Sequence, residues 1–138
     1  MRNITLTLLY LSLSLRAFAQ WNQVKRIDLV PDRVATDNLG QVYVVKGGEL
    51  IKFDAEGREQ LRNSVRLLGD ITTLDFKNAL KPMVFFKDLS QITFLDNQLA
   101  NRGDVLRLDA LGYAQTVATC SSYNNGLWLF DQVSFELT

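Results

Sequence analysis

The stretch that decides the fold covers residues 34–57, VATDNLGQVYVVKGGELIKFDAEG. It holds three short runs of strand-forming residues, and each run is followed by turn-forming residues. Asp and Asn bond their own backbone in turns and Gly tolerates a positive φ, so DNLG, GG and DAEG each predict a turn. Gly47 and Gly48 predict a two-residue hairpin between strands at 41–45 and 49–53, because such loops need positive φ.

The composition is that of an ordinary globular protein with one modest core: 138 residues, of which 47% are hydrophobic and 22% charged. Fifteen basic residues balance fifteen acidic ones, and no segment gathers enough basic residues for a phosphate-binding face, which disfavours nucleic acid as a partner. One cysteine and no histidine are present. The commonest metal ligand and general base are therefore missing, and we expect no cofactor, no metal site and no catalytic residue.

The N-terminus predicts export. Arg2 is followed by an apolar run over residues 4–15 and by the A-x-A cleavage motif at 17–19. Residues 1–19 are therefore expected to be a signal peptide, because the run is too short to cross a bilayer as a helix of about 20 residues. An uncleaved anchor is the alternative. The mature chain, from Gln20, is expected without a membrane span in the bacterial periplasm, at the outer surface or in the medium.

A period of about forty residues runs through the mature chain. The motif VKRID at Val24 recurs as VRLLG at Val65 and as VLRLD at Val105, at spacings of 41 and 40 residues. The apolar run at 42–45 likewise matches 83–86 and 127–130. The sequence therefore predicts repeats at about 24–64, 65–104 and 105–138 within one domain, 20–138.

Each repeat is about forty residues long and holds four strand candidates. This length and strand content match one β-propeller blade. The expected fold class is all-β, with about three four-stranded antiparallel blades in an incomplete ring and helix limited to one turn near 76–80 or 97–101. The run at 42–45 and its two counterparts are apolar on both faces, which is typical of strands covered by neighbouring blades on both sides. Three blades do not close a ring, so the chain is expected to be part of a longer propeller or to self-associate.

The segments 40–45 (GQVYVV) and 48–54 (GELIKFD), followed by Gly57, resemble a blade of the secreted bacterial β-propellers of the NHL and sensor-propeller type. The resemblance covers roughly residues 22–138 and is weakest in the second repeat, where 78–82 replaces the Asn-Leu-Gly turn. Such propellers are mostly scaffolds that bind proteins, glycans or peptides, and a minority are hydrolases or lactonases. The resemblance therefore implies architecture more than activity.

Acidic residues at equivalent strand ends are the first candidates for a site: Asp37, Asp54, Asp75 and Asp96. They suggest either a cation-binding rim or, as we prefer, turn residues that bond their own backbone. Residues 54–57 (DAEG) lack the oxygen ligands of a calcium loop.

Cysteine and aromatic residues are the next candidates. Cys120 precedes two serines but has no histidine base, so a half-buried structural thiol is expected. The repeat-locked aromatics are expected to be core rather than a stacking platform: Tyr43, Phe85, Phe86, Trp128 and Phe130. Trp21 precedes the first repeat and is expected to cap a sheet edge or contact a partner.

Basic residues recur near the first strand of each repeat: Lys25, Arg26, Arg33, Arg62, Arg66, Arg102 and Arg107. Because acidic residues are interspersed in equal number, a mixed solvated surface is favoured over a rim for an anionic glycan.

Two functions are compatible with the sequence. The preferred one is an exported, non-catalytic binding module or scaffold of the bacterial cell envelope that binds another protein or a glycan. The alternative is a secreted propeller hydrolase or lactonase that uses rim carboxylates with calcium, which the absence of histidine disfavours.

Export is expected to cleave the chain between Ala19 and Gln20, because the A-x-A motif follows the apolar run directly. Intact-mass measurement of the exported protein should give the mass of residues 20–138. A mass that retains residues 1–19 would contradict the signal peptide.

Overall fold

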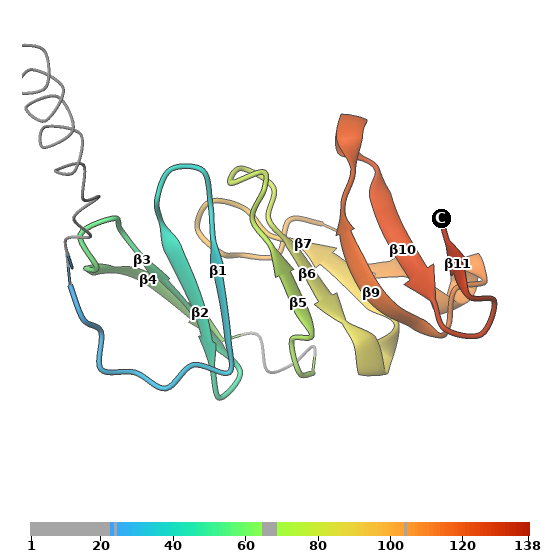
Figure 1. The fold of residues 1–138 in the computed structure, drawn as a ribbon, viewed down its shortest axis with the longest axis horizontal. Helices are drawn as coiled ribbons and strands as arrows, with labels where there is room; N and C mark the ends of the chain where they lie inside the picture. Colours follow the sequence, from blue (N-terminus) through green and yellow to red (C-terminus); the bar gives the residue numbers. More distant parts are fainter. Residues whose placement is uncertain (1–22, 24, 65–68, 104) are drawn as a thin grey trace, which may run out of the picture.

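The computed structural model describes residues 23, 25–64, 69–103 and 105–138. Within these residues the chain is all-β, as predicted: eleven strands form three antiparallel sheets, and the helical segments are three single-turn 3-10 helices. The sheets follow one another along the long axis of the molecule, and none is closed into a barrel (Figure 1). The expected signal peptide, residues 1–19, and Trp21 lie outside the described residues.

Each sheet is a meander in which every strand pairs with the next one along the chain. The first sheet has the order β1 (Arg33–Thr36), β2 (Val42–Lys46), β3 (Glu49–Phe53) and β4 (Glu59–Ser64). The second has the order β5 (Thr73–Asp75), β6 (Met83–Phe86), β7 (Gln91–Phe94) and β8 (Leu106–Arg107). The third contains β9 (Thr116–Ser121), β10 (Leu127–Asp131) and β11 (Glu136–Leu137).

The sheets are out of phase with the sequence repeats. No strand forms over residues 25–32, and β8, which lies at the start of the third repeat, is the last strand of the second sheet. The helical turns also differ from expectation. They occur at η2 (Lys87–Leu89), η3 (Asp109–Leu111) and η4 (Tyr123–Asn125), whereas residues 76–80 and 97–101 form turns and a single β-bridge.

The predicted hairpin joins β2 to β3. Lys46 pairs with Glu49, and the two residues between them, Gly47 and Gly48, have φ values of 57° and 78°. These angles match a type I′ turn, which requires positive φ at both central positions and follows the natural twist of the strands. The amide N–H of Gly47 donates to Asp32 Oδ2 at 2.7 Å, which ties the turn to the segment before β1.

Apolar side chains fill the layers between the sheets. The first layer joins the first and second sheets and contains Tyr43, stacked on Phe76 with ring centroids 3.5 Å apart. The second layer joins the second and third sheets around Met83 and Phe85. The first strands of successive sheets adjoin one another, β1 beside β5 and β5 beside β9. Each sheet therefore stacks on the next in the same way.

The open side of the first sheet is covered by the chain itself. Val44, Ile51 and Phe53 are buried on that side and pack against Ile27 and Leu29. The segment that carries Ile27 and Leu29 runs past the first sheet before it enters β1 (Figure 1). A segment expected to be a strand therefore acts as a cover without pairing in a sheet.

The directions in which the side chains point show that the repeat alignment is wrong by one residue. The sequence match aligns Val42 with Met83, yet Val42 faces residues 27–29 and Met83 faces the third sheet. Val84 and Phe86 are the residues of β6 that face backward along the chain, toward the first sheet. Alternate residues of a strand point to opposite faces, so a slip of one residue in the alignment reverses every side chain.

The degree to which the strands with two apolar faces are buried depends on the position of their sheet in the stack. All four residues of β6 are at most 1% exposed, because β6 lies between two neighbouring sheets. In β10 the exposed fraction of Trp128 reaches 45%, and Phe130 is partly buried. The expectation that these strands are covered on both faces is therefore confirmed for the second sheet, and the third sheet has one open face.

Replacing Gly48 by Val is expected to lower the free energy of unfolding by roughly 1 to 3 kcal/mol, because a β-branched residue is strained at positive φ. Gly48→Asn is the matched control, since Asn tolerates the left-handed region and should cost much less. Urea unfolding measures both variants. Equal stability of the Val variant and the wild type would contradict the turn.

Candidate functional site

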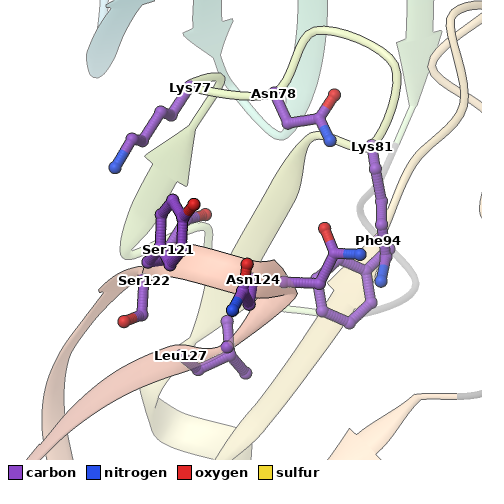
Figure 2. A pocket seen from close by; sticks show the side chains of 11 residues that line it. Lys77, Asn78, Lys81, Phe94, Ser121, Ser122, Asn124 and Leu127 are labelled. Carbon is purple, nitrogen blue, oxygen red and sulfur yellow. The ribbon is translucent and has the colours of Figure 1, made fainter.

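A pocket of about 440 Å³ opens between the loops of the second and third sheets. Its walls are the β5–β6 loop, the end of β7 and the β9–β10 loop. Figure 2 shows Lys77, Asn78 and Lys81 on one side and Ser121, Ser122, Asn124 and Leu127 on the other. The loops that join the first two strands of each sheet lie along the same edge of the molecule (Figure 1). The pocket is thus built by loops on rigid sheets, which is a common way to form a binding site.

The charge of the pocket is positive. Its described lining includes Lys77 and Lys81 and no acidic residue. The Lys81 ammonium lies 4.2 Å from the centroid of the Phe94 ring, where the electron-rich face attracts a cation and holds the side chain beside the cavity. Neither lysine forms an ion pair with a described carboxylate. Both charges therefore remain without an ion pair, although the Asp75 carboxylate lies near Lys77.

The β9–β10 loop gives the pocket its amide groups and an exposed aromatic ring. Asn124 and Asn125 have φ values of 54° and 58°, and Asn is one of the few residues that tolerate this region. The loop is closed by hydrogen bonds from the Ser122 N–H to the Gly126 carbonyl (2.8 Å) and from the Gly126 N–H to the Tyr123 carbonyl (3.1 Å). Tyr123 is 86% exposed. The loop is thus fixed in its backbone while its side chains face solvent and the pocket.

Asp75 fixes the two walls relative to each other. Its carboxylate accepts hydrogen bonds from the amide N–H of Ser121 in the third sheet (2.6 Å) and from the amide N–H of Lys77 in its own loop (2.9 Å). Burial raises the pKa of Asp75, but these two N–H donors and the nearby Lys77 charge outweigh burial, so its pKa lies below the usual value. Asp75 is therefore ionised at neutral pH and stabilises the pocket.

A second cavity of about 490 Å³ lies beside the β3–β4 turn and residues 97–98, with a different charge pattern. Its lining includes Asp54, Glu56 and Arg58, and the Arg58 guanidinium forms ion pairs with both acids, at 2.7 and 3.1 Å. Those charges neutralise one another. The pocket between the second and third sheets is therefore the stronger candidate for a ligand site.

The four predicted strand-end acids are turn residues, as preferred. Asp37, Asp54 and Asp96 each accept hydrogen bonds from the backbone N–H groups two and four residues ahead, at 2.8 to 3.1 Å. Asp37 also accepts the Tyr43 hydroxyl at 3.0 Å. Burial raises the pKa of Tyr43, and this contact with Asp37 raises it further. Within the described residues, no cluster of three or more Cys, Asp and Glu could hold a metal ion.

Cys120 differs from expectation because it is exposed. It lies in β9 opposite Trp128, on the open face of the third sheet, where no neighbouring sheet buries it. Tyr43, Phe85 and Phe86 are core residues, as predicted. Trp128 and Phe130 are not fully buried, for the same reason as Cys120.

The predicted basic residues lie on a mixed surface, and Arg66 falls outside the described residues. Arg26, Arg62 and Arg107 each form an ion pair with a nearby acid. Arg33 donates to the Thr72 carbonyl and Arg102 donates to the Leu80 carbonyl. Each of these five arginines contacts its own local acid or backbone carbonyl, so the five do not form a shared anion-binding rim.

The repeat does not reveal the pocket residues, because it marks only positions that recur at its period. Lys77, Lys81 and residues 121–126 (SSYNNG) lie where the repeats agree least. Loops that depart from a repeated scaffold are common positions for binding residues. The departure of these loops from the repeat was therefore the sequence signal that could have identified the pocket residues.

Comparison with known proteins gives no family for this chain. No protein-family model matches it, and no curated protein shows significant sequence similarity to it. Among the described residues, no helix has the length and apolar character needed to cross a membrane.

Replacing Asp75 by Asn is expected to destabilise the protein by about 1 kcal/mol at pH 7, a value reduced for partial solvent exposure of the carboxylate. Because the folded-state pKa is depressed, the stabilisation is present above the unfolded pKa of about 4 and is lost as the pH falls through the lower folded value. The difference between variant and wild type should therefore shrink below pH 4.

Denaturant unfolding at pH 7, 4 and 2.5 measures this difference. Asp88→Asn is the control, because Asp88 is exposed in η2 and should change stability little at any of these pH values. A difference for the Asp75 variant that stays constant with pH would contradict the role of its charge.

Proposed function

We propose that this chain is an exported, non-catalytic binding module of the bacterial cell envelope, built from β-propeller blades, and that its ligand is an acidic glycan. The pocket between the second and third sheets is the proposed binding site. The observation that carries this proposal is its lining, in which two lysines that form no ion pair with a described carboxylate stand beside asparagine amides and an exposed tyrosine.

The stacking of the sheets supports the propeller part of the proposal. Blades of a propeller are four-stranded antiparallel meanders that are arranged around a central axis. The first and second sheets have this strand order, and the first strands β1, β5 and β9 adjoin in sequence, as inner strands of neighbouring blades would. The blade-like sequence at 40–54 agrees with this arrangement.

The chemistry of the pocket favours a sugar with acidic groups. Asparagine side chains offer both donors and acceptors for sugar hydroxyls, and an exposed ring such as Tyr123 can pack on a sugar face. The ammonium groups of Lys77 and Lys81 add attraction for carboxylate or sulfate groups, and no acidic residue lines the pocket itself, although the ionised Asp75 near Lys77 offsets part of this attraction. A cavity of about 440 Å³ is in the range of small-ligand sites.

The rim carboxylates give little support to the alternative hydrolase. Asp37, Asp54 and Asp96 accept backbone hydrogen bonds in their own turns, and Asp75 accepts two amide N–H groups from different loops. A general acid or base needs a carboxyl group free to meet substrate. The function proposed here is therefore binding rather than catalysis.

Calorimetric titration with an oligogalacturonide and with a neutral maltooligosaccharide of equal length tests the proposal. We expect the acidic sugar to bind more tightly, and we expect added salt to weaken its binding because the attraction is electrostatic. The double variant Lys77→Gln, Lys81→Gln should lose at least about tenfold in affinity, roughly 1.4 kcal/mol.

Lys46→Gln is the matched control, because Lys46 is an exposed lysine at the β2–β3 turn away from the pocket. Binding of neither sugar, or equal loss in the control, would contradict the site. Tighter binding of a poly-glutamate peptide with the same lysine dependence would replace the glycan by an acidic protein segment.

A further inference from the structure

The outward surface of the third sheet is apolar. It is formed by side chains that the strand register places on one face: Ala118, Cys120, Trp128, Phe130 and Leu137. Trp128 lies opposite Cys120, and Phe130 lies opposite both Ala118 and Leu137. Leu127 and Leu129 point the other way, into the layer shared with the second sheet. We call the five residues the outer face.

This outer face is exposed to an extent unusual for large apolar side chains. Trp128 is 45% exposed and Leu137 is 65% exposed, and the adjacent β10–β11 turn adds Val133 and Phe135 at 73% and 77%. Phe135 has a φ of 55°, a backbone conformation that is rare for an aromatic residue. Contiguous exposed apolar surface of this kind marks interaction sites on soluble proteins.

The other sheets show that such faces are normally covered in this molecule. The corresponding face of the first sheet, with Tyr43 and Val45, is buried by the second sheet. That of the second sheet, with Met83 and Phe85, is buried by the third. Among the described residues, no apolar core cluster includes the outer face of the third sheet. The expected occupant therefore continues the stack and presents an apolar sheet face of its own.

We propose that a second copy of this chain docks on the outer face, third sheet against third sheet, around a two-fold axis. A head-to-tail arrangement would need the opposite end of the stack to be open, and there Ile27 and Leu29 already cover the first sheet. The outer face of another copy is the matching apolar surface that the described chain offers. Contact of the same face on both copies closes after two subunits.

The composition of the outer face suits this contact. None of its five residues is charged, so two copies meet without like-charge repulsion, and Trp128 is the kind of large ring that anchors interfaces. Two packed sheets lie about 10 Å apart with their side chains interdigitated, an arrangement that would shield the Cys120 thiol from reagents in solution. This proposal is independent of the proposed glycan site, because the outer face is on the opposite side of the third sheet from Leu127.

Sedimentation velocity of the full exported chain between about 1 and 100 μM tests the proposal, together with the rate at which a thiol reagent labels Cys120. We expect a reversible monomer–dimer equilibrium, and a labelling rate that falls several-fold as the dimer forms. Cys120 is the chain's sole cysteine, so the label reports this face alone.

Trp128→Lys should give a monomer at every concentration, because it places two like charges in the interface. Leu39→Lys is the matched control, since Leu39 is an exposed leucine in the β1–β2 turn of the first sheet, at the other end of the stack, and this variant should still dimerise. Circular dichroism checks that both variants fold, and the labelling measurement on the wild type does not depend on them.

Three results would overturn the proposal. A wild-type chain that stays monomeric at 100 μM excludes a second copy as the occupant. Growth into assemblies larger than dimers, or a dimer whose Cys120 is labelled as fast as in unfolded protein, places the contact elsewhere. Capture of a different envelope protein on the outer face in preference to a second copy would also replace this occupant.

Discussion

The constraint on which the rest of the structure depends is that every sheet carries apolar side chains on both faces. Such a sheet is most stable when both faces are removed from water, since exposed apolar surface costs about 25 cal/mol per Å². The second sheet meets this condition fully, because all four residues of β6 are buried between neighbours. The first sheet meets it through the segment that carries Ile27 and Leu29, and the third sheet leaves one face open. Stacking therefore determines the core, the cover over the first sheet and the open apolar face on the third.

The same stacking explains why the candidate binding site lies at the edge. The sheet faces are used for packing, so the polar chemistry is concentrated in the loops at the strand ends. In most of those loops the acidic side chain stabilises its own turn. The carboxylates of Asp37, Asp54 and Asp96 accept hydrogen bonds from backbone N–H groups of the same turn. Asp75 differs because its carboxylate also reaches the third sheet at Ser121, and the pocket with Lys77 and Lys81 lies beside that contact. A repeat-equivalent acid, Asp75, thus joins the two sheets, and the loop after it, which departs from the repeat, supplies the lysines of the cavity.

Much of the fold could be predicted from the sequence because short-range rules decide it. The all-β class, the Gly47–Gly48 hairpin and the turn role of the strand-end acids follow from local preferences, and β3 matches its predicted bounds. The sheet toward which each side chain of β6 points could not be predicted. An alignment of the repeats that is shifted by one residue matches apolar residues equally well, but it places every side chain on the opposite face. Burial of Cys120 and Trp128 was expected from their apolar strands, yet burial depends on a neighbouring sheet, which local sequence does not specify. The pocket was missed because its walls come from loops of two different sheets that are far apart in the sequence.

Hydrogen exchange of the backbone amides, read by mass spectrometry on the wild-type chain, tests the stacking most directly. Protection follows local stability, so strands covered on both faces should exchange most slowly. The account predicts the slowest exchange in β6 and β7, intermediate exchange in β2 and β3 under the cover of Ile27 and Leu29, and the fastest among paired strands in β10 and β11 at low protein concentration. Equal protection of all three sheets, or slower exchange in β10 than in β6 under those conditions, would contradict it.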